Sequence, residues 1–193
     1  MIPGKRDSRR ILGDHIFTQG DILRGDIEDA VAIGGWSMDD HPSGGFDDSG
    51  LKPARQILPP EVYNIPLRSL YSRNIRNLMM AGRNISASHV AFSSARVMAT
   101  CSVMGQAAGT AAALCAAWKL SPRELHRGRL RDLQQGLLAD DQTIKGLRNE
   151  DTLDLARHAT VTASSQEPGG EAAIILDGFV RDIPNAGGHH WAG

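Results

Sequence analysis

The chain has 193 residues, of which 41% are hydrophobic and 22% are charged, and its formal net charge is -1. These values are ordinary for one or two globular domains. The balanced charge gives no electrostatic reason to expect nucleic acid or an acidic membrane surface as a partner. The spacing of the two cysteines, Cys101 and Cys115, fits no zinc pattern, so the cysteines predict no metal site.

The first segment, residues 1–61, combines short apolar runs with turn-forming residues. RRILGD (residues 9–14) and DAVAIGGW (residues 29–36) predict short strands, and HPSGGFDDSG (residues 41–50) predicts a long loop. Polar residues in this segment leave several alternatives open. The cluster of Asp39, Asp40 and His41 has three possible roles: it lines a substrate cavity, binds a metal or forms a solvated turn. The pair Arg9 and Arg10 has two: it binds an anionic substrate or is an ordinary surface pair.

The second segment, residues 62–120, contains a long run with almost no charge. NLMMAG (residues 77–82) predicts a buried strand that ends in glycine. After a polar loop, Ser93 and Ser94 are candidate N-caps for a helix of about 24 residues that ends near Trp118.

The predicted helix carries two stripes of residues along its length, and three interpretations of its role are open. One stripe is suited to burial: Val97, Cys101, Met104, Ala108, Ala111 and Cys115. The other has almost no side chain: Gly105, Gly109, Ala112 and Ala116. The helix spans a membrane, packs closely on a sheet in a core, or forms the wall of a cofactor site. Ser102, Gln106 and Thr110 interrupt the run, which disfavours the membrane interpretation.

The cofactor interpretation rests on the predicted order of strand, polar loop and helix. This order places free backbone N–H groups and the positive end of a helix dipole at the carboxyl edge of a strand. In open α/β sheets, ligands bind at that edge. Gly82 has no Cβ and would allow a ligand to approach the backbone.

The third segment, residues 121–150, predicts a helix with a clear start. Ser121 is the expected N-cap, Pro122 takes the first helical position and Glu124 completes a capping box. The apolar side of this helix consists of Leu125, Leu130, Leu133 and Leu137. The fourth segment, residues 151–193, contains ATVTASSQ (residues 159–166) and AAIILDGF (residues 172–179), which both predict β-structure.

One part of the chain resembles a known family. IPLRSLYSRNIRNLMMAGRNISASHVAFSSARVMATCSVMGQAAGTAAALC (residues 65–115) is similar to the C-terminal FAD-binding segment of a family of FAD-dependent oxidoreductases. In that family NLxxAGRxxSxSH is followed by RVMxTCxxMGQAAGTAAAL. SRRILGDHIFTQGDI and GGWSMDDHPSGG look like its substrate-domain segment, so the resemblance covers roughly residues 6–118.

The resemblance implies an α/β chain: the C-terminal portion of an FAD/NAD(P)-binding-type flavoprotein fold with part of its β-rich substrate domain. It implies FAD as cofactor and a small molecule as substrate. The helix start and Arg96 would face the pyrimidine edge of the flavin, where a positive charge stabilises the reduced form. His89 would be a proton donor or acceptor, or would only form hydrogen bonds. The implied cofactor-binding residues are Ala81, Gly82, Arg83, Ser88, His89, Ser94, Arg96, Val97 and Met98.

The sequence departs from this family in one respect. The family opens with a strand–GxGxxG–helix unit that holds the FAD pyrophosphate, and no GxGxxG occurs in these 193 residues. We therefore expect the chain to be a fragment of an oxidoreductase that is inactive by itself. The alternative is a non-catalytic carbohydrate-binding or scaffold protein.

Residues 151–193 resemble the start of a discoidin-like, galactose-binding module, through VTASS, an Asp-Gly pair and a tryptophan. This resemblance implies an incomplete β-sandwich in this chain. It also implies that glycans are partners of the longer protein of which the chain would be a fragment. The expected partners are therefore a small-molecule substrate and glycans, with no nucleic acid and no membrane span. The identity of the substrate is left open. The cellular compartment, including whether the longer protein is exported, is also left open.

Overall fold

The computed structural model describes residues 9–48, 50–182 and 188–193. Parts of three predicted segments therefore lie outside the described residues: residues 1–8 of the substrate-domain segment, Ser49 in the predicted loop, and residues 183–187 of the C-terminal module.

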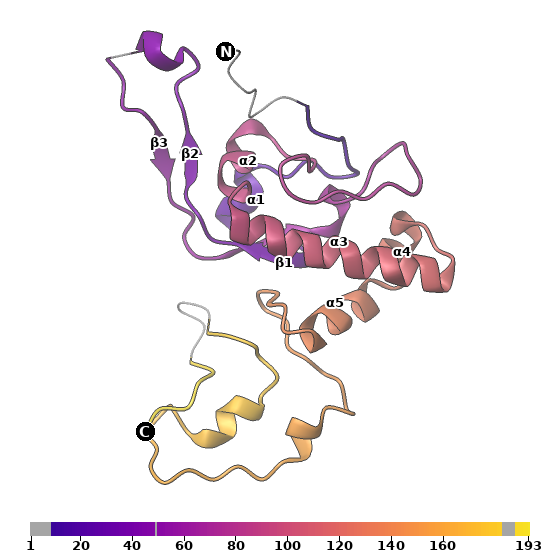
Figure 1. Cartoon of the computed structure of the whole chain (residues 1–193). Coiled ribbons are helices and arrows are strands. Elements are labelled where there is room, and N and C mark those ends of the chain that lie inside the picture. The colour runs from indigo at the N-terminus through magenta and orange to yellow at the C-terminus, as the bar shows by residue number, and fades with distance from the viewer. Residues whose placement is uncertain (1–8, 49, 183–187) are drawn as a thin grey trace.

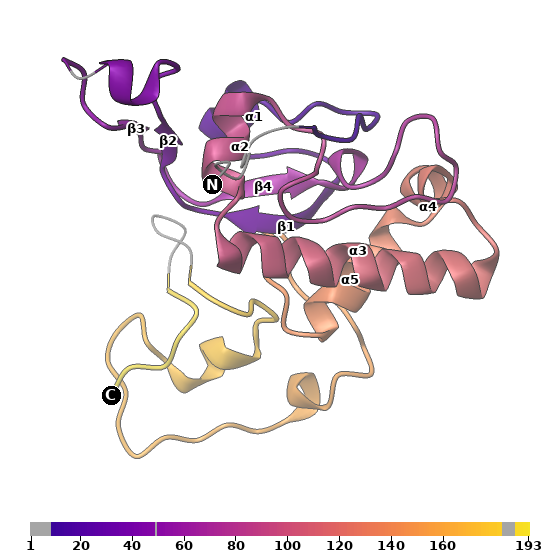
Figure 2. The ribbon, with the colours of Figure 1, turned by 45° about the horizontal axis from the view of Figure 1, so that its top comes forward.

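The centre of the fold is a pair of antiparallel strands, β1 (Ala30–Gly34) and β4 (Tyr63–Pro66). Every residue of both strands is buried, and the register shifts between Ala30 and Ala32. The helices α3 (Met98–Trp118) and α5 (Leu130–Ala139) pack against β1, and α1 (Gln19–Arg24) packs against β4. Figure 2 shows the strand pair between these two groups of helices. Burial on both faces explains why β1 is a continuous apolar run, and the strand predicted over residues 29–36 is confirmed.

A second antiparallel pair forms a hairpin that projects from this body (Figure 1). It consists of β2 (Met38–Asp40) and β3 (Arg55–Ile57), and β2 lies against α2 (His89–Ala95). The predicted loop lies at its tip and contains a 3-10 helix at Gly45–Asp48. The strand predicted over residues 9–14 is absent, and this segment is irregular, with Ile11 N–H donating to the Asn84 carbonyl.

The strand predicted over residues 77–82 is reduced to a single antiparallel bridge between Met79 and Tyr71. Two flanking hydrogen bonds hold it, from Met80 N–H to the Leu70 carbonyl and from Ser72 N–H to the Leu78 carbonyl. Met80 is buried, as expected for the apolar run. Among the described residues no further strand pairs with this segment, so the expected parallel sheet is not formed here.

The long helix predicted from Ser93 is two helices, α2 and α3, that meet at 94°. Ser88 is the N-cap of α2 and accepts a hydrogen bond from Ala91 N–H. Ser93 and Ser94 lie inside α2 and are buried, so their predicted role as caps is wrong. The chain turns at Val97, whose extended backbone (φ -70°, ψ 150°) ends one helix and starts the next. In the described part of the chain, no single helix is long and apolar enough to cross a membrane, and α2 and α3 pass that test only as a bent pair.

The face of α3 that contacts the core differs in part from the predicted one. Met104, Ala111 and Cys115 are buried as predicted, together with Thr100 and Ala107. The stripe that contains Gly105 and Gly109 is exposed to solvent. A Cβ atom added to either glycine would meet no heavy atom within 4 Å, so the close packing of this helix on a sheet, which one interpretation predicted, does not involve this stripe.

The capping box of the third segment is confirmed. Ser121 Oγ accepts from Glu124 N–H, and the Glu124 carboxylate accepts from Ser121 N–H. The predicted single helix divides at Arg129 into α4 (Pro122–Gly128) and α5. Leu125, Leu133 and Leu137 are buried, while Leu130 packs partly buried against the core.

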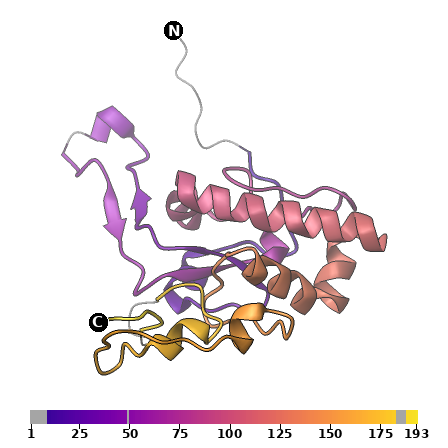
Figure 3. The same ribbon diagram turned by 60° about the horizontal axis from the view of Figure 1, so that its bottom comes forward.

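The C-terminal segment from residue 151 onward contains no strand among its described residues (Figure 3). Its regular elements are two 3-10 helices, Leu155–His158 and Ala172–Leu176. The predicted β-structure is therefore wrong for residues 159–166 and 172–179. Leu153 and Leu155 are more than four-fifths exposed, which shows that this segment has few apolar surfaces against which strands would pack.

Candidate functional site

The junction of α2 and α3 brings together a helix start, a cation and an exposed apolar side chain. Arg96 is the C-cap of α2, Val97 is the N-cap of α3 and Met98 is the first residue of α3. Val97 provides no side-chain hydrogen bond to the helix, so the first backbone N–H groups of this 21-residue helix lack a cap. The Met98 side chain is 88% exposed. The junction therefore combines an uncapped helix start with a partly buried cation.

Gly82 and Arg83 lie beside this junction. Gly82 has φ +83°, a conformation that side chains rarely adopt. The Arg83 guanidinium lies over the Phe92 ring, with Cζ 4.9 Å from the ring centroid, and Arg10 contacts the same ring at 5.3 Å. Cys101, in the first turn of α3, is the nearest side chain to Gly82. Ala81, like Gly82 and Arg83, is partly exposed, so this segment remains accessible next to the helix start.

Ser94 forms a buried connection between three segments. Its Oγ donates to the Trp36 carbonyl at 2.6 Å and lies 2.5 Å from the Tyr63 hydroxyl. Burial raises the pKa of Tyr63 to about 12, although the hydrogen bond to Ser94 acts in the opposite direction. The Ser94 hydroxyl is thus engaged inside the fold, whereas Ser88 is partly exposed at the start of α2.

The strand β2 provides the polar side chains that face α2. The Ser37 hydroxyl, 2.6 Å from Asp39, is the main cause that lowers the pKa of the Asp39 carboxyl; the Trp36 indole and the charge of Arg96 add to it. The Arg96 guanidinium lies 3.5 Å from the Asp39 carbonyl oxygen. Hydrogen bonds and charge therefore keep Asp39 ionised next to Arg96.

His89, the first residue of α2, pairs with Asp40, which follows Asp39 in β2. Its Nε2 atom is 3.3 Å from Asp40 Oδ1, and the His89 side chain is 55% exposed. Both side chains line a cavity of about 1000 Å³. The remaining lining residues come from the hairpin: residues 41–43, 48, 51, 52 and 54–56. We call this cavity the hairpin pocket.

The alternatives for Asp39, Asp40 and His41 are narrowed by this geometry. Asp40 and His41 line the hairpin pocket and Asp39 does not; that this pocket is a substrate cavity stays a prediction. In the described ranges, no group of three or more His, Cys, Asp or Glu side chains is arranged to hold a metal ion. Arg10 lies against Phe92, and Arg9 lies outside the hairpin pocket.

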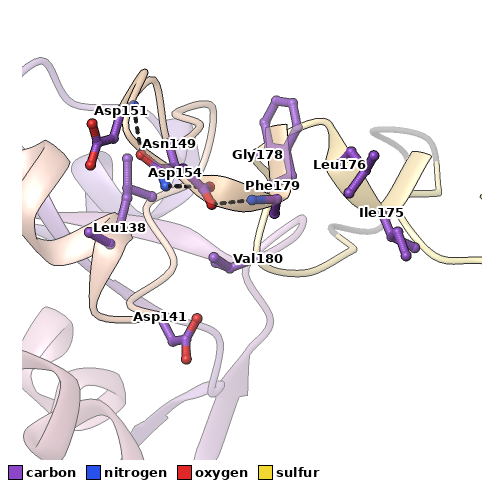
Figure 4. Close-up of a pocket in the computed structure, with 12 residues that line it drawn as sticks. Leu138, Asp141, Asn149, Asp151, Asp154, Ile175, Leu176, Gly178, Phe179 and Val180 are labelled. Carbon is purple, nitrogen blue, oxygen red and sulfur yellow. Dashed lines mark hydrogen bonds between the residues drawn. The ribbon is translucent and has the colours of Figure 1, made fainter. Parts of the chain in front are cut away.

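A second cavity of about 480 Å³ lies between the end of α5 and the C-terminal segment (Figure 4). Asp141, Asp151 and Asp154 contribute carboxylates, and Phe179 and Val180 contribute apolar surface. The Asp154 carboxylate already accepts hydrogen bonds from Asn149 and from Ala156 N–H. All residues that line this cavity lie between residues 138 and 180.

Several residues of these sites were not predicted from the sequence. The resemblance singled out His89 and Arg96 but gave no reason to pair them with β2, because that contact depends on how a distant hairpin packs. Lys52 and Arg55 were also missed. The register of β2 on β3, which places Arg55 opposite Asp40, has no signal in the local sequence.

Comparison with known proteins gives one match. A family model described as FAD dependent oxidoreductase matches residues 1–137. No curated protein and no solved structure matches the chain. The matched range includes the α2–α3 junction and the hairpin pocket, whereas the cavity of Figure 4 lies entirely outside it.

Proposed function

Since the chain belongs to the family of FAD-dependent oxidoreductases, we propose that its α2–α3 junction is the flavin-facing part of an oxidoreductase site. FAD is the cofactor of this family, and it supplies the redox step by accepting a hydride or electrons from the substrate. The contribution of the chain is to position the cofactor and to set the charge around it. The substrate is a small molecule.

The observation that carries this proposal is the uncapped start of α3 next to Arg96. The first N–H groups of a long helix and a guanidinium provide donors and positive charge, which suit the carbonyl-rich pyrimidine edge of a flavin. Val97 and Met98 would contact that edge through their backbone, and Ala81, Gly82 and Arg83 would lie along the neighbouring part of the cofactor. Ser88 and His89 would lie on the substrate side, because α2 starts at the hairpin pocket.

Ser94 has a different place in this proposal. Its hydroxyl is occupied by Tyr63 and by the Trp36 carbonyl, so it would hold the junction in place without contacting the flavin.

A titration with three flavins tests the proposal. Because no GxGxxG occurs in the sequence, we expect FAD, FMN and riboflavin to bind the purified chain with similar, weak affinity, and no stoichiometric flavin to remain after desalting. Flavin fluorescence reports the binding. Arg96→Met should weaken the binding of the reduced flavin more than that of the oxidised form, because it removes the charge that favours the reduced anion.

The matched control is Arg127→Gln, which removes an exposed cation from α4. A tenfold change in the ratio of the two affinities corresponds to about 30 mV for a two-electron couple. Equal effects of Arg96→Met and Arg127→Gln would remove Arg96 from the site. Absence of any flavin binding would contradict the proposal for the junction.

A further inference from the structure

The hairpin pocket has a composition that indicates the chemical class of its ligand. Its volume of about 1000 Å³ is at the upper end of the range for pockets that bind small molecules. Charged side chains, neutral hydrogen-bonding side chains and apolar groups all contribute to its walls. Each of these three groups restricts the ligand.

The two carboxylates of the pocket are already engaged. Asp40 pairs with His89 at 3.3 Å, and Asp48 accepts a hydrogen bond from Gly44 N–H at 2.8 Å. Each carboxylate therefore already has a partner within the protein, a histidine for Asp40 and a backbone N–H for Asp48.

The two cations of the pocket are in the opposite situation. Within the described part of the chain, no hydrogen bond or ion pair involves the side chain of Lys52 or of Arg55. Arg55 lies directly opposite Asp40 in the β2–β3 ladder, yet Asp40 pairs with His89 from another element. Two such cations in the lining of one pocket can give charge-assisted hydrogen bonds to an anion, and a guanidinium can form two of them with a carboxylate.

The remaining lining residues indicate hydroxyl groups on a carbon skeleton. Ser43 and Gln56 are exposed side chains that donate and accept hydrogen bonds. Pro42, Leu51 and Ala54 provide apolar surface between them. A polyhydroxylated acid offers the matching groups: a carboxylate, several hydroxyls and C–H faces.

We propose that the hairpin pocket binds a small polyhydroxylated carboxylate, such as a sugar acid, as the substrate of the site. Lys52 and Arg55 hold the carboxylate, and the His89–Asp40 pair lines the same pocket at the start of α2. The identification of this ligand as the substrate rests on the proposed function. Its binding to the pocket does not, because binding requires no flavin.

Three six-carbon probes separate the contributions in an amide-resolved NMR titration of the flavin-free chain. Gluconate carries both the carboxylate and the hydroxyls, glucitol carries only hydroxyls, and hexanoate carries only the carboxylate. We expect gluconate to shift the signals of the hairpin and of His89, and to bind at least tenfold more tightly than either of the other probes. Equal binding of glucitol would overturn the role of the cations, and equal binding of hexanoate would overturn the role of the hydroxyls.

Two variants and a control complete the test. Lys52→Gln and Arg55→Gln should each weaken gluconate binding several-fold, whereas Arg127→Gln, which removes an exposed cation from α4, should have no effect. Because both substitutions are at exposed positions, unchanged signals from β1 and β4 will confirm that the variants fold. Gluconate binding that survives both substitutions would contradict the proposal. Failure of the flavin titration with intact gluconate binding would contradict the proposed function alone.

Discussion

At the scale of single residues, the buried carboxylate of Asp29 forms an ion pair with the partly exposed Arg68. Asp29 is 1% exposed and accepts three hydrogen bonds from Arg68, two from the guanidinium and one from the backbone N–H. Burial alone would raise the pKa of Asp29, but these bonds and the charge of Arg68 outweigh it and hold the pKa below 3.8. A carboxyl whose pKa is lowered by folding stabilises the protein above its unfolded-state pKa, and this contribution is lost as the pH falls through the folded-state pKa.

We therefore expect the free energy of unfolding to decrease below about pH 4, where Asp29 and similar carboxyls become protonated. Asp29→Asn should lower the stability at neutral pH by about 3 kcal/mol, because it leaves Arg68 without its charged partner. The free energy of unfolding of the variant should also decrease less between neutral and acidic pH than that of the unmodified protein. Urea unfolding between neutral and acidic pH measures both effects.

Asp132→Asn is the matched control for this prediction. Asp132 is half exposed and pairs with Arg129 on the surface of α5, so its loss should cost less than about 1 kcal/mol. A loss at Asp29→Asn as small as that of the control would show that the buried pair does not stabilise the fold.

Single residues also show the limits of prediction from the sequence. Gly82 and Arg96 lie near the α2–α3 junction and His89 lies at the start of α2, and the contact of all three with a flavin stays a prediction. The role of Ser94 as a cap was wrong, since a serine before a helical pattern looks the same whether it caps the helix or lies inside the preceding one. Its contacts with Tyr63 and Trp36 link positions 31 and 58 residues away, beyond the reach of local rules.

At the scale of elements, α3 offers a direct test of which face is buried. Gly105 and Gly109 are exposed and surrounded by open space. Alanine is a better helix former than glycine, so Gly105→Ala and Gly109→Ala should each raise the free energy of unfolding by roughly 0.5–1 kcal/mol. Ala107 is fully buried on the other face. Ala107→Leu should lower the free energy of unfolding by about 1–3 kcal/mol through overpacking.

Thermal and urea unfolding of the three variants provide the measurement. The reverse order, with a loss at Gly109→Ala and tolerance at Ala107→Leu, would show that the glycine stripe is covered in solution. A gain at both glycines would support an α3 that presents its small residues to solvent in this chain.

Elements differ in how far the sequence determines them. The capping box of α4 was predictable because all its atoms lie within four residues, from Ser121 to Glu124. The strand β1 was predictable because burial on both faces requires a continuous apolar run. The bend between α2 and α3 was not, because the residues around Val97 are compatible with a continuous helix and the turn depends on packing against β2 and β1.

At the scale of the whole molecule, two regions differ in how much they contribute to the core. The core cluster of buried residues and the side chains packed on it end at Leu147. Beyond residue 150, Ala172 is the one hydrophobic side chain among the described residues that is buried. The sequence indicated a boundary near residue 151, and we propose it as a domain boundary. The strands predicted beyond it did not form: residues 159–166 alternate small residues that offer little surface to bury, and the apolar run at residues 172–176 is a 3-10 helix.

We therefore expect a chain that ends at Glu150 to keep the stability of the full chain to within about 1 kcal/mol, since Ala172 is the one buried hydrophobic side chain among the described residues that it loses. It should also keep the flavin and gluconate binding proposed above, because both sites lie before residue 100. A chain that ends at Asp141 is the control. It loses the buried Ile144 and also Gln142, whose side-chain amide donates to the Val31 carbonyl in β1, so its stability should fall by several kcal/mol. Urea unfolding of the three chains distinguishes the outcomes. If ending the chain at Glu150 costs as much as ending it at Asp141, residues 151–193 are part of the same cooperative unit, and the proposed boundary is wrong.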